Sequence, residues 1–174
     1  MLGPRTRRTM ASRAAAMVKV VPTLGVISDT HGLLRPEARK AMGQVDGILH
    51  AGDFDEPGIL QRVAAWGPLT AVRGNMDRGA WARGLPERAV LTVDGFIIHV
   101  LHDVHQLALD PEAEGIAVVV SGHTHRPRNE LQGSVLYFNP GSAGPRRRAW
   151  PVSVGKLHLS SAGVRGEIIL LEPF

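Results

Sequence analysis

Residues 23–32 of this 174-residue chain read TLGVISDTHG, and this short stretch decides the fold. Its first six residues are apolar in the middle, which is typical of a strand that is buried on both faces of an α/β sheet. Asp29 and His31 follow at once. Polar side chains directly after a buried strand lie at the carboxyl edge of the sheet, where α/β proteins form their ligand sites.

The same order of apolar strand and polar residue recurs along the chain. Residues 47–51 (GILHA), 69–72 (LTAV), 96–101 (FIIHVL) and 116–120 (IAVVV) each precede at least one residue of a metal-ligating type. We therefore expect seven side chains to converge on one rim of the fold, since strand ends of this kind open on the same side. The seven are Asp29, His31, Asp53, Asn75, His102, His123 and His125.

Helix and hairpin signals complete the expected architecture. Pro36 and Pro57 are placed as the first residues of two helices, which end before Gly43 and at Ala65. Asp94-Gly95 predicts a hairpin between strands 89–93 and 96–101, and further strands are expected at 135–138, 152–159 and 164–171. Strand–helix alternation followed by hairpins predicts a four-layer α-β-β-α sandwich of two facing mixed sheets. His50 and His99, inside apolar strands, are expected to be hydrogen-bonded residues of the sheets.

The seven polar side chains form a plausible ligand set for two cations. Asp29 and His31 are two residues apart, so in an extended chain both point the same way and can hold one ion, and His123 and His125 repeat this spacing. Asp53 can bridge two ions, because dinuclear sites hold their metals roughly 3.5–4 Å apart. Two divalent ions with only two aspartates leave a positive surplus, which favours binding of a phosphate ester.

Composition restricts the metal and the compartment. The chain has no cysteine, which excludes disulfides, thiolate nucleophiles and cysteine-ligated zinc. A metal must be held by oxygen and imidazole nitrogen, which suits manganese, iron, zinc or nickel, and manganese is the first expectation. The absence of cysteine also fits a reducing compartment, so a cytoplasmic location is expected.

The positive charge belongs to the N-terminus. The chain has a net charge of +4, but residues 1–22 contain five basic residues and no acidic one, which leaves 15 basic and 16 acidic residues in the remainder. We expect residues 1–22 to be a basic, disordered extension and residues 23–174 to form one domain. No specific nucleic-acid partner and no membrane span are expected, since the domain carries no basic excess and the chain no long apolar run.

At this point the motifs are similar to those of a known family. Asp29-x-His31, Gly52-Asp53, Gly74-Asn75-x-Asp77, His102 and Gly122-His123-x-His125 resemble the calcineurin-like metallophosphoesterase superfamily. The short length and Asn139-Pro-Gly-Ser142 resemble its small bacterial and archaeal phosphodiesterase (YfcE-like) branch. The resemblance runs from about Thr23 to the C-terminus, with the five motifs in order.

The resemblance implies a role for each ligand. Asp29, His31, Asp53 and His125 would hold a first divalent ion, and Asp53, Asn75, His102 and His123 a second. The implied activity is hydrolysis of a small phosphate ester, a diester rather than a monoester, by attack of metal-bound hydroxide. A homo-oligomer is compatible with the sequence.

Two departures from the family pattern leave the proton donor to the leaving group unassigned. Many members carry histidine where this chain has Met76, and the small branch usually has glycine where it has Asp103. Asp77 and His105, together with Asp55, are the candidates for that role. The alternative function is a catalytically silent metal-binding scaffold module, which the retromer scaffold subunit of the same fold exemplifies. The complete ligand set favours the enzyme.

Overall fold

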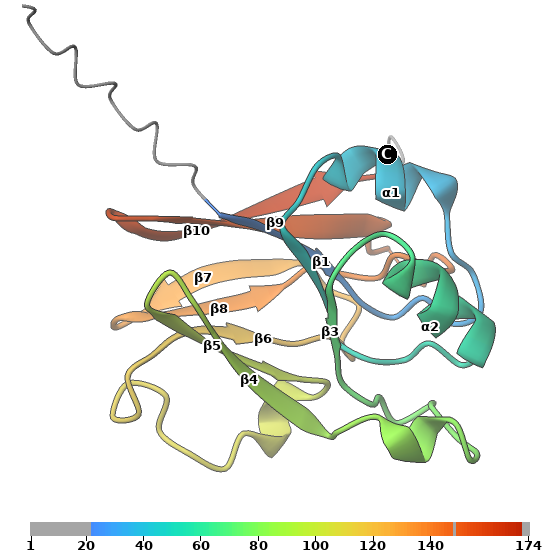
Figure 1. Ribbon diagram of the computed structural model, residues 1–174, viewed down its shortest axis with the longest axis horizontal. Helices are drawn as coiled ribbons and strands as arrows, with labels where there is room; N and C mark the ends of the chain where they lie inside the picture. Colours follow the sequence, from blue (N-terminus) through green and yellow to red (C-terminus); the bar gives the residue numbers. More distant parts are fainter. Residues whose placement is uncertain (1–21, 148, 172–174) are drawn as a thin grey trace, which may run out of the picture.

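Two five-stranded sheets face each other in the computed structural model, which describes residues 22–147 and 149–171 (Figure 1). The first sheet has the order β10-β9-β1-β2-β3 and the second β4-β5-β6-β8-β7, and both mix parallel and antiparallel pairs. Apart from residue 22, the predicted extension 1–22 lies outside the described residues. The first sheet comprises β1 (Thr23–Ile27), β2 (Gly47–His50), β3 (Leu69–Ala71), β9 (Ser153–Ser160) and β10 (Gly163–Leu170). The second comprises β4 (Arg88–Val93), β5 (Phe96–Leu101), β6 (Ile116–Val120), β7 (Arg128–Gln132) and β8 (Val135–Asn139).

The main core lies between the two sheets and follows from the alternation of side chains along each strand. Leu24 and Val26 of β1 belong to the same buried cluster as Val100 of β5 and Val118 of β6. Ile27 instead belongs to a second cluster on the outer face of the first sheet. Burial on both faces explains why β1 is almost continuously apolar.

Short helices cover that outer face. Both α1 (Pro36–Met42) and α2 (Pro57–Ala64) begin with proline, and their buried residues Met42 and Ile59 pack with Ile27. A single-turn 3₁₀ helix, η1 (Ala82–Gly84), follows β3. Among the described residues, no helix is long and apolar enough to cross a membrane.

The second sheet is covered by a segment that is mostly loop. Residues 102–115 contain the 3₁₀ helix η2 (Val104–Gln106), and Val104 and Leu107 pack against Leu101 and Val119 of the sheet. The predicted sandwich of two facing mixed sheets is confirmed, and its outermost layer on this side is thin.

One expectation about the sheet residues is wrong. His50 is hydrogen-bonded as expected, but neither ring nitrogen of His99 has a partner within the described residues, although His99 is buried. His99 faces outward from β5 beneath the η2 segment, where only a narrow space adjoins Leu107. Burial, followed by the nearby charge of Arg88, lowers the pKa of His99, so its ring is neutral at pH 7.

Candidate metal centre

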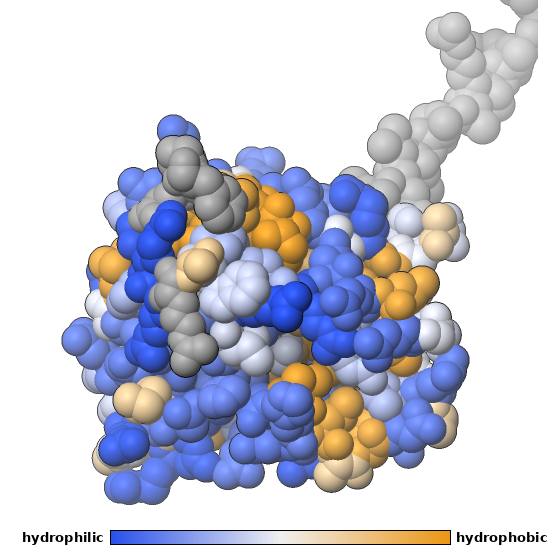
Figure 2. All heavy atoms as spheres, turned by 180° about the vertical axis from the view of Figure 1, so that it is seen from behind, coloured by the Kyte–Doolittle hydropathy of each residue, from blue (hydrophilic) through white to orange (hydrophobic). Residues whose placement is uncertain are grey.

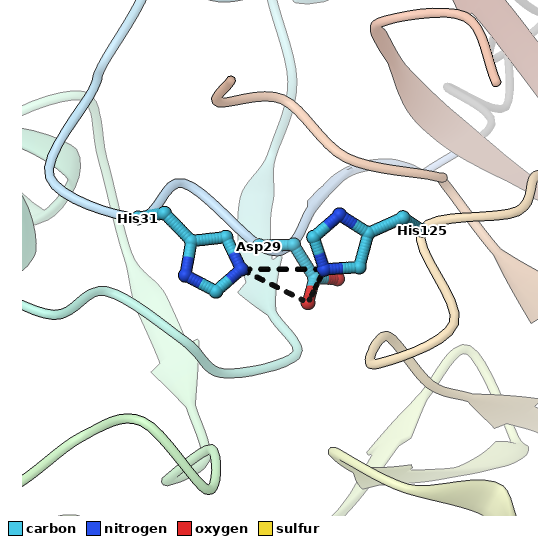
Figure 3. A group of neighbouring side chains, drawn as sticks. All are labelled: Asp29, His31 and His125. Carbon is cyan, nitrogen blue, oxygen red and sulfur yellow. Dashed lines mark hydrogen bonds and ion pairs between the residues drawn. The ribbon is translucent and has the colours of Figure 1, made fainter. Parts of the chain in front are cut away.

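Three buried or half-buried side chains form a first cluster at the end of β1 and β6. Asp29 Oδ1 lies 3.3 Å from His125 Nε2 and 3.9 Å from His31 Nε2 (Figure 3). The two imidazole nitrogens face each other at 3.3 Å. Nitrogen lone pairs and a carboxylate aimed at one point repel one another unless a cation sits among them, so this donor set fits a divalent metal.

A second cluster joins the two sheets. Asn75 follows β3 of the first sheet, whereas His102 and His123 follow β5 and β6 of the second. The Asn75 side-chain oxygen lies 3.0 Å from His102 Nε2 and 3.0 Å from His123 Nδ1. One oxygen and two imidazole nitrogens thus meet at a second point.

Asp53 lies between the two clusters. Its Oδ2 is 3.8 Å from His31 Nε2 of the first cluster and 3.3 Å from His102 Nε2 of the second. Its Oδ1 accepts a hydrogen bond from the Met76 backbone N–H at 2.8 Å. This placement fits a carboxylate that bridges two ions.

The backbone at the ligand positions differs from the extended chain that the spacing argument assumed. Five of the seven predicted ligands have a left-handed backbone, with φ between 43° and 66°: Asp29, His31, Asp53, His123 and His125. The extended-chain argument is therefore wrong for Asp29 and His31, which converge through two left-handed residues. It is also wrong for His123 and His125, whose rings turn to different clusters, as the family resemblance implied.

Polar partners lie beside three of the four histidines, at hydrogen-bond distance for His102 and His31 and at ion-pair distance for His123. His102 Nδ1 donates to the Ala51 carbonyl at 2.7 Å, so its Nε2 faces Asp53. His31 Nδ1 lies 3.2 Å from Asp55, and His123 Nε2 lies 3.9 Å from Asp103. Such outer partners fix the tautomer of a ligating histidine. His125 Nδ1 is buried and has no partner among the described residues.

Burial shifts the pKa values of two residues of the first cluster, Asp29 and His125. Burial raises the pKa of Asp29 to about 6, although the neighbouring His102 and Ser28 act in the opposite direction. Burial lowers the pKa of His125 to about 4, assisted by the charges of His31 and Arg147. A bound cation would favour the ionised aspartate and the neutral imidazole together.

Asp53 and His102 form a coupled pair. Burial acts to raise the pKa of Asp53, but the hydrogen bond and charge of His102 outweigh it and the pKa is lowered. Burial acts to lower the pKa of His102, but the hydrogen bond and charge of Asp53 outweigh it and the pKa is raised. The Asp53 carboxylate is therefore held ionised.

Asp77 lies between the loops that carry Asp53 and Asn75 and binds the backbone of both. Its buried carboxylate accepts four backbone N–H groups at 2.7–3.0 Å, from Asp53, Phe54, Asp55 and Gly74. Both carboxylate oxygens are therefore engaged by backbone N–H groups, and the role of Asp77 as a proton donor stays a prediction. Its contacts tie the Asp53 loop to the Asn75 loop.

The other candidate donors differ in their surroundings. His105 lines a separate cavity and not the cavity beside Asn75. Asp55 is engaged with His31. The Met76 side chain is 40% exposed, and the residue contacts the site through its backbone.

A cavity of about 190 Å³ adjoins the second cluster. Its lining includes Asn75, His102 and His123 of the second cluster and also Arg73, Glu87, Asp103 and Gln106. Arg73 and Glu87 are paired across its wall at 2.5 Å. Arg73, Glu87 and Gln106 were not predicted as site residues, since each is a common surface residue type with no motif around it.

Comparison with known proteins identifies the family that the sequence motifs resemble. A family profile described as the calcineurin-like phosphoesterase superfamily domain matches residues 23–162. A probable metallophosphoesterase from Methanothermobacter thermautotrophicus is 37% identical over 159 residues, which cover 84% of this chain and 91% of the relative.

Two solved structures share the fold at lower identity. A novel archaeal phosphodiesterase has a TM-score of 0.70 at 23% identity, over 84% of this chain and 99% of that one. Vacuolar protein sorting 29 from Cryptosporidium parvum has a TM-score of 0.68 at 18% identity, over 86% and 97%. The seven predicted ligands all lie within the residues that the family profile matches, and this chain belongs to the calcineurin-like phosphoesterase superfamily.

Proposed function

We propose that this protein is a dinuclear metal-dependent phosphodiesterase. The observation that carries the proposal is the position of Asp53, whose Oδ2 faces His31 on one side and His102 on the other. Asp29, His31 and His125 would hold the first ion, and Asn75, His102 and His123 the second. Two such ions lower the pKa of a bound water and draw electron density from the phosphoryl oxygens.

The protein's own residues position the reaction. Asp77 fixes the two loops that carry Asp53 and Asn75, and Ala51 and Asp55 orient the rings of His102 and His31. This preorganisation means that little rearrangement is needed when the transition state forms.

A diester is the proposed substrate class because the cavity beside Asn75 offers room for a substituent next to the phosphoryl group. Its volume of about 190 Å³ lies below the roughly 300–1,000 Å³ of drug-sized ligand sites, which favours a small substituent. The pair of Arg73 and Glu87 would contact a polar group of that substituent. The name of the archaeal phosphodiesterase with the same fold supports this choice.

Manganese is the proposed metal, since a site of carboxylate, amide oxygen and imidazole suits it, and iron, zinc and nickel are the alternatives. The proposed location is the cytoplasm, where a chain without cysteine needs no oxidising environment. We expect no specific nucleic-acid partner.

The competing function is a metal-binding scaffold without catalysis. The fold shared with vacuolar protein sorting 29 is the reason to consider it. Hydrolysis of bis(4-nitrophenyl) phosphate and of 4-nitrophenyl phosphate by manganese-loaded protein separates the two. We expect turnover of the diester that stops after chelation and in Asp53→Asn. Glu114→Gln, which neutralises an exposed carboxylate in the loop before β6, is the matched control and should retain activity. Metal binding without turnover of either ester would favour the scaffold.

A further inference from the structure

A second cavity of about 310 Å³ lies beside the loop that carries His123 and His125, and the proposed reaction does not use it. Its lining includes Thr124 of that loop, Arg126 from the segment before β7, Arg128 from the start of β7, and His105 from η2. The volume is at the lower end of the range for small-molecule sites, roughly 300–1,000 Å³.

Two aromatic rings hold the two arginines in place. The Arg126 guanidinium lies 5.0 Å from the centroid of the Trp150 ring, and the Arg128 guanidinium lies 4.9 Å from that of Tyr137. A stacked guanidinium stays charged and keeps its N–H groups in one plane, so it loses little conformational entropy when an anion binds.

The cavity has a surplus of positive charge and of donors. Arg128 Nε donates to Glu130 at 2.9 Å, whereas Arg126 has no carboxylate within 4 Å among residues 22–147 and 149–171. The two arginines and one glutamate leave a net charge of +1. The Ser121 and Thr124 hydroxyls and the His105 imidazole supply further groups that can donate to oxygen.

We propose that this cavity binds a second phosphate-class anion, next to but distinct from the metal centre. A planar, stacked arginine without a carboxylate partner is suited to the oxygens of a phosphate group. The anion is either a terminal phosphate of the diester substrate or a free phosphate. Thr124 connects the cavity to both clusters, since it lies between His123 and His125. Figure 2, which views the molecule from behind, shows a face on which hydrophilic residues predominate and apolar residues form several patches.

The test is calorimetric titration of the full chain with inorganic phosphate at low salt, with and without prior chelation of metal. We expect phosphate binding that survives chelation and weakens about tenfold or more in Arg126→Gln, because a charge-assisted hydrogen bond and a charge are lost. Arg126→Lys keeps the charge but not the planar guanidinium, so its affinity for phosphate should fall between those of wild type and Arg126→Gln. Arg62→Gln on α2 is the matched control and should bind like wild type.

Absence of phosphate binding after chelation, or equal affinity in wild type and Arg126→Gln, would overturn the proposal. The metal centre is tested separately, since phosphate bound there is lost on chelation and retained in Arg126→Gln. The source of the anion is then assigned with two nitrophenyl diesters, one of which ends in an additional phosphomonoester. A rise in KM in Arg126→Gln for that ester alone assigns the site to the substrate. An effect of added phosphate on both esters that is lost in Arg126→Gln assigns it to a free anion.

Discussion

At the scale of single residues, the centre depends on side chains whose burial is costly without their partners. Asp77 and His50 are both buried polar residues that contact neither cluster, yet each satisfies backbone or hydroxyl groups of the loops that carry the ligands. Partners of this kind determine where the ligand side chains point. Their replacement therefore tests the architecture of the site separately from its chemistry.

Asp77→Asn should lower the free energy of unfolding by about 2 kcal/mol or more, because an amide N–H₂ would then face backbone N–H donors that the carboxylate accepted. Urea unfolding measures the change, with Glu114→Gln as the exposed control. Unchanged stability together with loss of the basic limb of the pH–rate profile would instead identify Asp77 as the proton donor.

His50 should make stability fall in acid. Burial lowers the pKa of His50 to about 3, while the unfolded chain takes up this proton near the ordinary value of 6.5. The contribution of neutral His50 is therefore complete above pH 6.5 and decreases below it, with a limiting slope of about 1.4 kcal/mol per pH unit.

Urea unfolding of wild type and His50→Phe at pH 7.5 and pH 5 isolates this group, because the other titrating residues are common to both proteins. Wild type should lose about 2 kcal/mol more than His50→Phe over this interval. Equal losses would show that His50 is already protonated in the folded protein.

At the scale of elements, the loops after the strands fit one another so closely that some positions have no room for a side chain. A Cβ on Gly144 would overlap the carbonyl oxygen of Thr30, the residue between Asp29 and His31. Gly58 in α2 is the opposite case, since a Cβ there meets nothing within 4 Å.

Gly144→Ala should therefore destabilise the protein by about 1–3 kcal/mol and weaken metal binding, because the backbone must shift. Gly58→Ala should stabilise it by about 0.5–1 kcal/mol, as alanine does in a helix. Thermal unfolding of the two variants gives the comparison. A neutral Gly144→Ala would mean that the loop around Thr30 adjusts freely.

The elements that could be predicted from the sequence are those with a strong local pattern. The strand 116–120 is observed with the predicted bounds, and both helices begin at the expected prolines. β7 was missed because its sequence, RNELQ, has no apolar alternation, and only pairing with β8 makes it a strand. The seven residues that gather at the candidate site could be named from the sequence, but not the left-handed backbone that directs His123 and His125 to different clusters.

At the scale of the whole molecule, charge and fold are separate properties of the chain. The positive excess belongs to residues 1–22, whereas the family profile begins at residue 23. The sequence therefore predicts that the domain folds and acts without this segment.

Deletion of residues 1–20 should leave the melting temperature and the turnover of bis(4-nitrophenyl) phosphate unchanged, since the segment contains none of the seven predicted ligands. Circular dichroism and a rate assay on matched preparations provide the measurement. A large decrease in either quantity would show that the segment contributes to the domain.

The central claim is that Asp53 joins two metal sites, and the amount of manganese bound at saturation tests it most directly. Elemental analysis after dialysis against excess manganese should give about two equivalents for wild type. It should give about one equivalent for His125→Ala, which removes a ligand of the first site only, and less than one for Asp53→Asn, which affects both. A wild-type plateau at one equivalent, or two equivalents retained in Asp53→Asn, would contradict the bridged two-metal centre.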